Sequence, residues 1–219
     1  IAVFDHDVRR HLDFVERMEA ALGVGGEAVR ALAERVREQL AAKRPGEVDI
    51  PEVQDIKRVI RESEAVSGIE VMGLSREHAR FLDLPFYQTG KVRKDPIGPA
   101  DVRIVRALLE EIRPDMILVA GDLSDPHGTH RMCKEAVDTA LAEVRAAGGK
   151  VPEVWLYRGA WQEWPITEAT WLVPMSQEEL RLKIQAIFKH QSQKDSAPFP
   201  GQDEREFWQR VEQRNKDTA

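Results

Sequence analysis

The chain has 219 residues, of which 42% are hydrophobic and 32% charged, and its formal net charge is −6. This size and balance suit one globular domain with a buried core, and no basic stripe of the kind that nucleic-acid binding requires stands out. No apolar run is long enough to cross a bilayer and no signal peptide is visible, so the sequence predicts neither a membrane nor a nucleic-acid partner. A single cysteine, Cys133, excludes an internal disulfide framework and favours a reducing, cytoplasmic compartment.

The opening fifty residues predict helices on the surface of the protein. Apolar residues recur at helical spacing between Leu12 and Leu22, after an aspartate that can cap a helix. A second helix is expected over residues 27–42, and Pro45 stops it. Both segments are strongly charged, so residues 1–50 are interpreted as a helical insertion or as surface helices outside the core.

Residues 51–193 are the expected core, in which helices alternate with short strands. Helices are predicted from residue 53 to a stop at Gly68, and over 100–112, 131–147 and 177–190; strands are predicted over 69–74, 81–85, 116–120 and 153–157. Ser176 and Glu179 have the spacing of a capping box. Residues 194–219 are a tail with a terminal helix. This alternation predicts an α/β fold with a mostly parallel sheet, and a Rossmann-like three-layer arrangement is expected.

The most informative stretch follows the apolar strand Met116–Ala120. The next ten residues, GDLSDPHGTH, contain Asp122, Asp125, His127 and His130. Ligands of parallel sheets bind beyond the carboxyl ends of the strands, so chemistry is expected in this loop. Imidazoles three residues apart at the start of a helix can face one side and bind a metal or move a proton, and carboxylates can orient their rings. The spacing fits equally well a second interpretation. In it, an aspartate caps the next helix, and the histidines lie at the start of that helix without a functional role.

Four stretches help to decide between a metal site and a capped helix, because of the order in which they follow one another along the chain. They are Arg61–Ala65, Phe81–Pro85, the loop that ends in His-Gly-Thr-His-Arg at residues 127–131, and Phe188–Gln193 with its His-Gln-Ser-Gln sequence. Together they resemble the PIG-L/LmbE-like family of zinc-dependent N-deacetylases. The segments GDLSDPHGTH, LYRGAWQEW and IFKHQSQKD further resemble the deacetylase-like portion of long bacterial proteins labelled glucosamine-6-phosphate deaminase. Residues 1–219 would then be the carboxy-terminal part of such a domain.

The resemblance implies a zinc centre that hydrolyses the amide of an N-acetyl amino sugar or sugar phosphate. His130 takes the place of the family's zinc-binding histidine, and His127 that of the histidine that acts as general acid and steadies the oxyanion. Asp125, close before them, is the second catalytic candidate. The family's first motif, of Ala-His-Pro-Asp-Asp type, supplies two further zinc ligands and the catalytic base. No His-Pro-Asp sequence occurs among these residues, so an incomplete site and missing amino-terminal strands are expected.

Three further residues are candidates for binding the sugar. Gln88 follows a predicted strand, and Arg158 and Trp161 follow the last one. A fixed guanidinium and aromatic faces suit a sugar phosphate. Trp155 and Trp171 are instead expected to pack in the core. The alternative to a zinc deacetylase is a non-catalytic sugar-binding or regulatory module of a fused protein, and an oligomer is compatible with either function.

Overall fold

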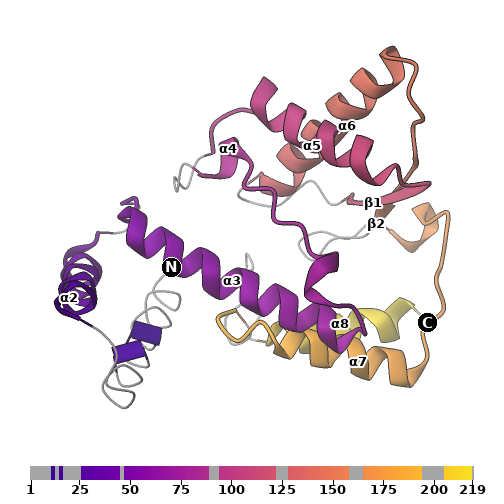
Figure 1. The fold of residues 1–219 in the computed structure, drawn as a ribbon. Helices are drawn as coiled ribbons and strands as arrows, with labels where there is room; N and C mark the ends of the chain where they lie inside the picture. The colour runs from indigo at the N-terminus through magenta and orange to yellow at the C-terminus, as the bar shows by residue number, and fades with distance from the viewer. Residues whose placement is uncertain are drawn as a thin grey trace. The chain divides into compact units, whose positions relative to one another are not determined.

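The computed structural model describes residues 11–12, 15–16, 26–44, 47–88, 94–121, 128–157, 165–193 and 205–218. The chain divides into two compact units, which are described separately: unit 1 comprises Ile1–Arg80 and Pro174–Ala219, and unit 2 comprises Phe81–Val173. Figure 1 labels their helices and strands. None of the described helices is both long and apolar enough to span a bilayer.

The described elements of unit 1 are helices. They are α2 (Glu27–Ala42), α3 (Pro51–Val71), the short 3₁₀ helix η1 (Arg76–His78), α7 (Gln177–Phe188) and α8 (Phe207–Thr218). Pro51 begins α3, where the amide that proline lacks would have no partner within the helix. At the start of α7, Glu179 N donates to Ser176 Oγ at 3.1 Å and Ser176 N donates to the Glu179 carboxylate at 2.6 Å, which confirms the predicted capping box.

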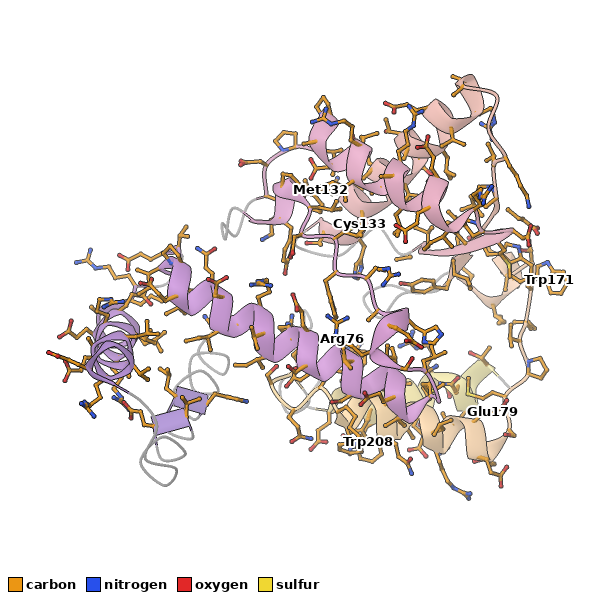
Figure 2. The ribbon with its side chains drawn as sticks, in the orientation of Figure 1. Arg76, Met132, Cys133, Trp171, Glu179 and Trp208 are labelled. Atoms are coloured by element: carbon orange, nitrogen blue, oxygen red, sulfur yellow. The ribbon has the colours of Figure 1, made fainter. Side chains whose placement is uncertain are left out.

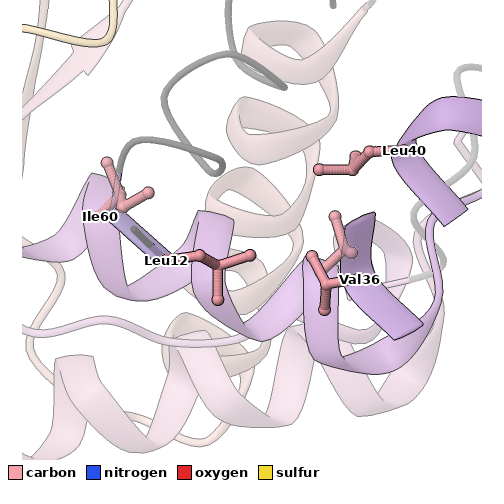
Figure 3. Packing of buried hydrophobic residues seen from close by; sticks show 5 residues of the cluster. Leu12, Val36, Leu40 and Ile60 are labelled. Atoms are coloured by element: carbon pink, nitrogen blue, oxygen red, sulfur yellow. The ribbon is translucent and has the colours of Figure 1, made fainter. Parts of the chain in front are cut away.

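One apolar cluster joins the amino-terminal helices of unit 1 (Figure 3). Val36 and Val53 are fully buried at its centre, one on α2 and the other on α3. Leu12, Leu40 and Ile60 complete the cluster, and residues 11–12 and 15–16 are helical. The regular spacing of these residues places them on the buried faces of their helices, which is why the pattern located α2 correctly.

Gly68 does not end α3, and that prediction is wrong. The helix continues to Val71, and the backbone turns only at Gly73, whose φ of 83° favours glycine. A Cβ added to Gly68 would lie 3.2 Å from His190 Nε2 and 3.6 Å from the carbonyl oxygen of Ala186. The glycine therefore serves a close approach between α3 and the end of α7. Because α3 continues to Val71, Ile69–Leu74 forms the end of a helix and a turn, and the predicted strand is not present.

Unit 2 contains the sheet. Its elements are α4 (Pro85–Gln88), α5 (Pro99–Ile112), β1 (Met116–Ala120), α6 (Thr129–Ala146), β2 (Glu153–Tyr157) and the 3₁₀ helix η2 (Ile166–Glu168). The two strands are parallel, in a register that pairs Met116 with Glu153 and Ala120 with Tyr157, and α6 connects them. Both strands and the helix between them agree with the prediction, so the chain has a small parallel sheet in a helix-rich α/β arrangement.

Residues 81–85 are not the strand that their alternating pattern predicts. They pair with no described strand, Asp83 among them has a φ of 47°, and they lead directly into α4. Leu82 and Leu84 pack against the cluster that joins α5 to α6, formed by Val102, Val105, Ala136 and Ala140. Apolar and polar residues alternate here because Leu82 and Leu84 pack against the two helices. A half-buried strand shows the same alternation.

The amino ends of α5 and α6 lie at the carboxyl end of the sheet. Only three residues separate the end of α5 from β1, and a short turn links the end of α6 to β2, so both helices finish at the amino end of the parallel strands. At 1.5 Å per residue each helix is about 20–27 Å long, whereas a strand of five residues is only about 17 Å long. Each helix therefore begins beyond the carboxyl end of the strands. The first turn of α6 and the first turn of α5 therefore lie at the same end of unit 2.

The sheet presents exposed apolar side chains. Leu118 is 63% exposed and Met116 is 44% exposed, although an apolar run of this kind is typical of a strand covered on both faces. Trp171 is 69% exposed, so the prediction that it packs in the core is wrong; its ring lies against that of Trp155, with centroids 4.9 Å apart. The two tryptophan rings thus pack against each other, while much of Trp171 stays exposed.

Candidate functional site

The histidine loop joins the carboxyl end of β1 to α6. Gly121 continues the strand ladder, because its N–H donates to the Tyr157 carbonyl at 2.9 Å. Asp122, Asp125 and His127 lie outside the described residues. Gly128, the residue before α6, has a φ of 68°, and a Cβ there would lie 2.9 Å from Arg131 Nη2. Glycine is therefore required to turn the chain from the loop into the helix.

His130 is the second residue of α6 and is partly buried. Its Nδ1 atom is buried and has no hydrogen-bond partner among the described residues. A buried polar atom left without a partner costs about 1–3 kcal/mol, so such an atom calls for a ligand or a neighbour. An imidazole nitrogen is a common metal ligand, and His130 therefore fits the role of a metal-binding residue. The described part of the chain contains no group of three histidine, cysteine, aspartate or glutamate side chains that could hold a metal.

The remaining predicted site residues are only partly described. Gln88 is the last residue of α4, and only its backbone is described; Arg158 and Trp161 follow β2 but lie outside the described residues. The topology nevertheless brings three elements that carry or precede predicted positions to one end of unit 2. His130 begins α6 there, α4 lies at the start of α5, and β2 ends there. Figure 2 labels Met132 and Cys133 on the first turns of α6, on the side of unit 2 where α4 lies.

Asp101 holds α4 in place and was not among the residues predicted from the sequence. The side chain is 2% exposed; one carboxylate oxygen accepts from Phe86 N at 2.9 Å and the other from Gly98 N at 2.8 Å. Asp101 thus ties the start of α4 to the start of α5, where a carboxylate also meets the positive end of the helix dipole. The spacing from Gly98 to Asp101 is that of a capping residue, which was the signal available in the sequence.

Tyr87 and Lys94 form a second feature at this end. Lys94 Nζ lies 4.1 Å from the centroid of the Tyr87 ring, within the range of a cation–π contact. Tyr87 is 48% exposed, and burial lowers the pKa of the Lys94 ammonium. No pattern in the sequence singles out Lys94, because five intervening positions separate it from α4.

A separate polar cluster lies in unit 1, between α3 and the end of α7. Ser192 is 4% exposed, and it donates from its backbone N and its Oγ to the two oxygens of the Glu64 carboxylate, both at 2.7 Å. His190 is half-buried beside them. Burial lowers its pKa, the Arg61 charge adds to that effect, and the Glu64 charge opposes it. Two of the stretches on which the family resemblance rests thus contact each other in the structure.

Comparisons with known proteins agree with this resemblance. Residues 21–141 match the PIG-L family, described as GlcNAc-PI de-N-acetylase. Over 225 aligned residues the chain is 46% identical to a glucosamine-6-phosphate deaminase-like protein of Bacteroides thetaiotaomicron; the match covers 100% of this chain and 34% of the relative. The chain therefore spans about a third of the length of that relative. No solved structure matches the chain.

Proposed function

Because the chain belongs to the PIG-L family, we propose that it is part of a zinc-dependent N-deacetylase that hydrolyses the acetamide of an amino sugar. The name of the bacterial relative refers to glucosamine 6-phosphate, which makes a phosphorylated amino sugar the narrower candidate. The Rossmann-like three-layer fold is proposed on the same basis. The parallel β1–β2 pair and its connecting helix support it.

The observation that carries the proposal is the buried Nδ1 of His130, which has no partner among the described residues and lies at the end of the sheet where ligands bind. We propose that His130 holds the zinc ion. A bound zinc ion lowers the pKa of water and polarises the amide carbonyl. His127, three residues earlier, would protonate the leaving amine and stabilise the oxyanion, and Asp125 would orient an imidazole ring. Gln88, Arg158 and Trp161 would contact the sugar.

The two histidines can be told apart by experiment. In a polypeptide that carries this chain together with the family's first metal motif, we would measure bound zinc and acetate release from N-acetylglucosamine and its 6-phosphate. His130→Ala should lose zinc and activity together. His127→Ala should keep zinc while turnover falls about 10²–10⁴-fold, the usual contribution of a general acid. Equal loss of zinc in both variants would show that the roles are wrongly assigned.

The 219-residue chain by itself provides a second arm of the same experiment. The resemblance gives it one zinc ligand, and affinity for zinc requires several ligands held in the right geometry, so little zinc and no acetate release are expected. Stoichiometric zinc with turnover would mean that the ligand set is complete within these residues. If the polypeptide with the first motif binds the sugar but releases no acetate, the alternative function, a sugar-binding or regulatory module, is favoured.

A further inference from the structure

Tyr87 is anchored at one end of unit 2, and Lys94 lies against its ring. Phe86 is 3% exposed, and its N–H donates to the buried Asp101 carboxylate, so the backbone immediately before Tyr87 is anchored. The Tyr87 ring meets the ring of Phe86 edge to face, with centroids 6.2 Å apart. Lys94 Nζ then lies over the Tyr87 ring. Contacts to buried groups therefore position an aromatic ring and an ammonium group together on the surface.

The Lys94 ammonium has an unusual electrostatic setting. Among the described residues, the contact found for the ammonium is the ring of Tyr87. Burial lowers the pKa of Lys94, which means that its charge is already partly stripped of water. A positive charge in this setting gains more from an arriving anion than a fully hydrated lysine does, because less water has to be displaced.

This pair lies at the same end of the sheet as His130. Asp101, on the first turn of α5, anchors α4, and the first turns of α5 and α6 both lie at the carboxyl end of β1. Leu82 and Leu84, which lead into α4, pack against the cluster that α5 and α6 form together. A substrate held at His130 would thus have the Tyr87–Lys94 pair on its periphery, at the edge of the same surface.

We propose that Tyr87 and Lys94 form a subsite for an anionic group of the substrate, so that the substrate is an acidic amino sugar such as a phosphate monoester. This inference rests on the proposed function for the identity of the sugar. The three N–H donors of the ammonium bind phosphate or carboxylate oxygens, and the exposed part of the tyrosine ring provides a surface for the sugar. Asp101 is a positioning residue in this arrangement, since it acts through α4 and does not touch the anion.

The test compares two sugars that differ by one phosphate group. Isothermal titration of the full chain with N-acetylglucosamine and with its 6-phosphate should show about tenfold tighter binding of the phosphorylated sugar, and the preference should fall as salt is raised. Lys94→Met should reduce the preference to less than about twofold, and Lys94→Arg should keep it. Lys150→Met is the matched control, because Lys150 pairs with Asp115 at the opposite end of the same sheet. Inorganic phosphate as a third ligand tells whether the anion binds without the sugar.

The outcomes separate this inference from the proposed function, because the readout is binding and requires neither zinc nor turnover. Equal affinity for the two sugars, no binding of either, or an unchanged preference in Lys94→Met would each overturn the subsite. A preference that depends on Lys94 without any acetate release in the complete polypeptide would support the subsite and refute the deacetylase. Should Lys94→Met fail to fold, as judged by thermal unfolding, Tyr87→Leu removes the ring beneath the ammonium and should lower the same preference severalfold.

Discussion

Glu64 and Ser192 are 128 residues apart in the sequence, and both oxygens of the Glu64 carboxylate accept hydrogen bonds from Ser192. One bond comes from the backbone N and the other from Oγ, each at 2.7 Å, and Ser192 is nearly inaccessible to solvent. The contact fixes the segment after α7 against the middle of α3. It is the longest-range pair of polar contacts found among the described side chains of unit 1.

Replacing Glu64 should destabilise this unit. Glu64→Gln leaves one oxygen and places an amide NH₂ against a donor of Ser192, so a buried N–H or O–H loses its acceptor. The expected cost is about 1–3 kcal/mol in the free energy of unfolding, measured by urea denaturation. Glu70→Gln, on an exposed position of the same helix, is the control. If the two variants unfold at the same urea concentration, the Glu64–Ser192 contact does not contribute to stability.

Gly68→Ala tests the close approach of α3 and α7. In a helix interior this change normally stabilises by about 1 kcal/mol, but here the new Cβ would lie 3.2 Å from His190 Nε2. We expect a net loss of stability in the otherwise unchanged chain. With His190→Ala in addition, the obstruction disappears and Gly68→Ala should become stabilising. A double-mutant cycle of thermal unfolding measures this reversal of sign, and its absence would show that His190 moves aside at no cost.

Acid should weaken unit 1 through His190. Burial, with a smaller effect of the Arg61 charge, lowers the pKa of His190 in the folded protein, while the nearby Glu64 charge opposes the shift. The unfolded chain therefore binds a proton at a higher pH than the folded one, and stability is lost as the pH falls below about 6.5. Urea unfolding across this range should show a smaller dependence on pH for His190→Gln than for the unchanged chain.

Asp101 should matter for stability as well as for the position of α4. Asp101→Asn keeps the shape of the side chain but turns one acceptor into a donor that faces a backbone N–H, so one of the two buried bonds is lost. The expected loss is about 1–3 kcal/mol by denaturant unfolding. Asp138→Asn, whose partner Lys134 lies one turn away on the surface of α6, should change stability by less than about 1 kcal/mol. Similar losses in both variants would argue against an anchoring role for Asp101.

The sequence predicted well those elements whose local signals agree with their packing. The bounds expected for α2, β1 and β2 coincide with those in the structure, because apolar spacing, proline or glycine stops and strand length all indicate the same answer. Predictions failed where a tertiary contact overrides the local signal. Gly68 leaves room for His190 to approach α3. Apolar and polar residues alternate over residues 81–85 because Leu82 and Leu84 pack against α5 and α6.

What the sequence by itself determined is the family, the parallel βαβ unit, and the histidine loop that follows β1. These depend on residue types at fixed spacings, which can be read along the chain. Only the tertiary structure decided that the His130 Nδ1 is buried without a partner among the described residues, that Asp101 anchors α4, and that Lys94 lies over Tyr87. Burial and the meeting of distant side chains depend on how helices pack. Spacing along the chain does not encode that packing, because many partners could cover the same apolar face.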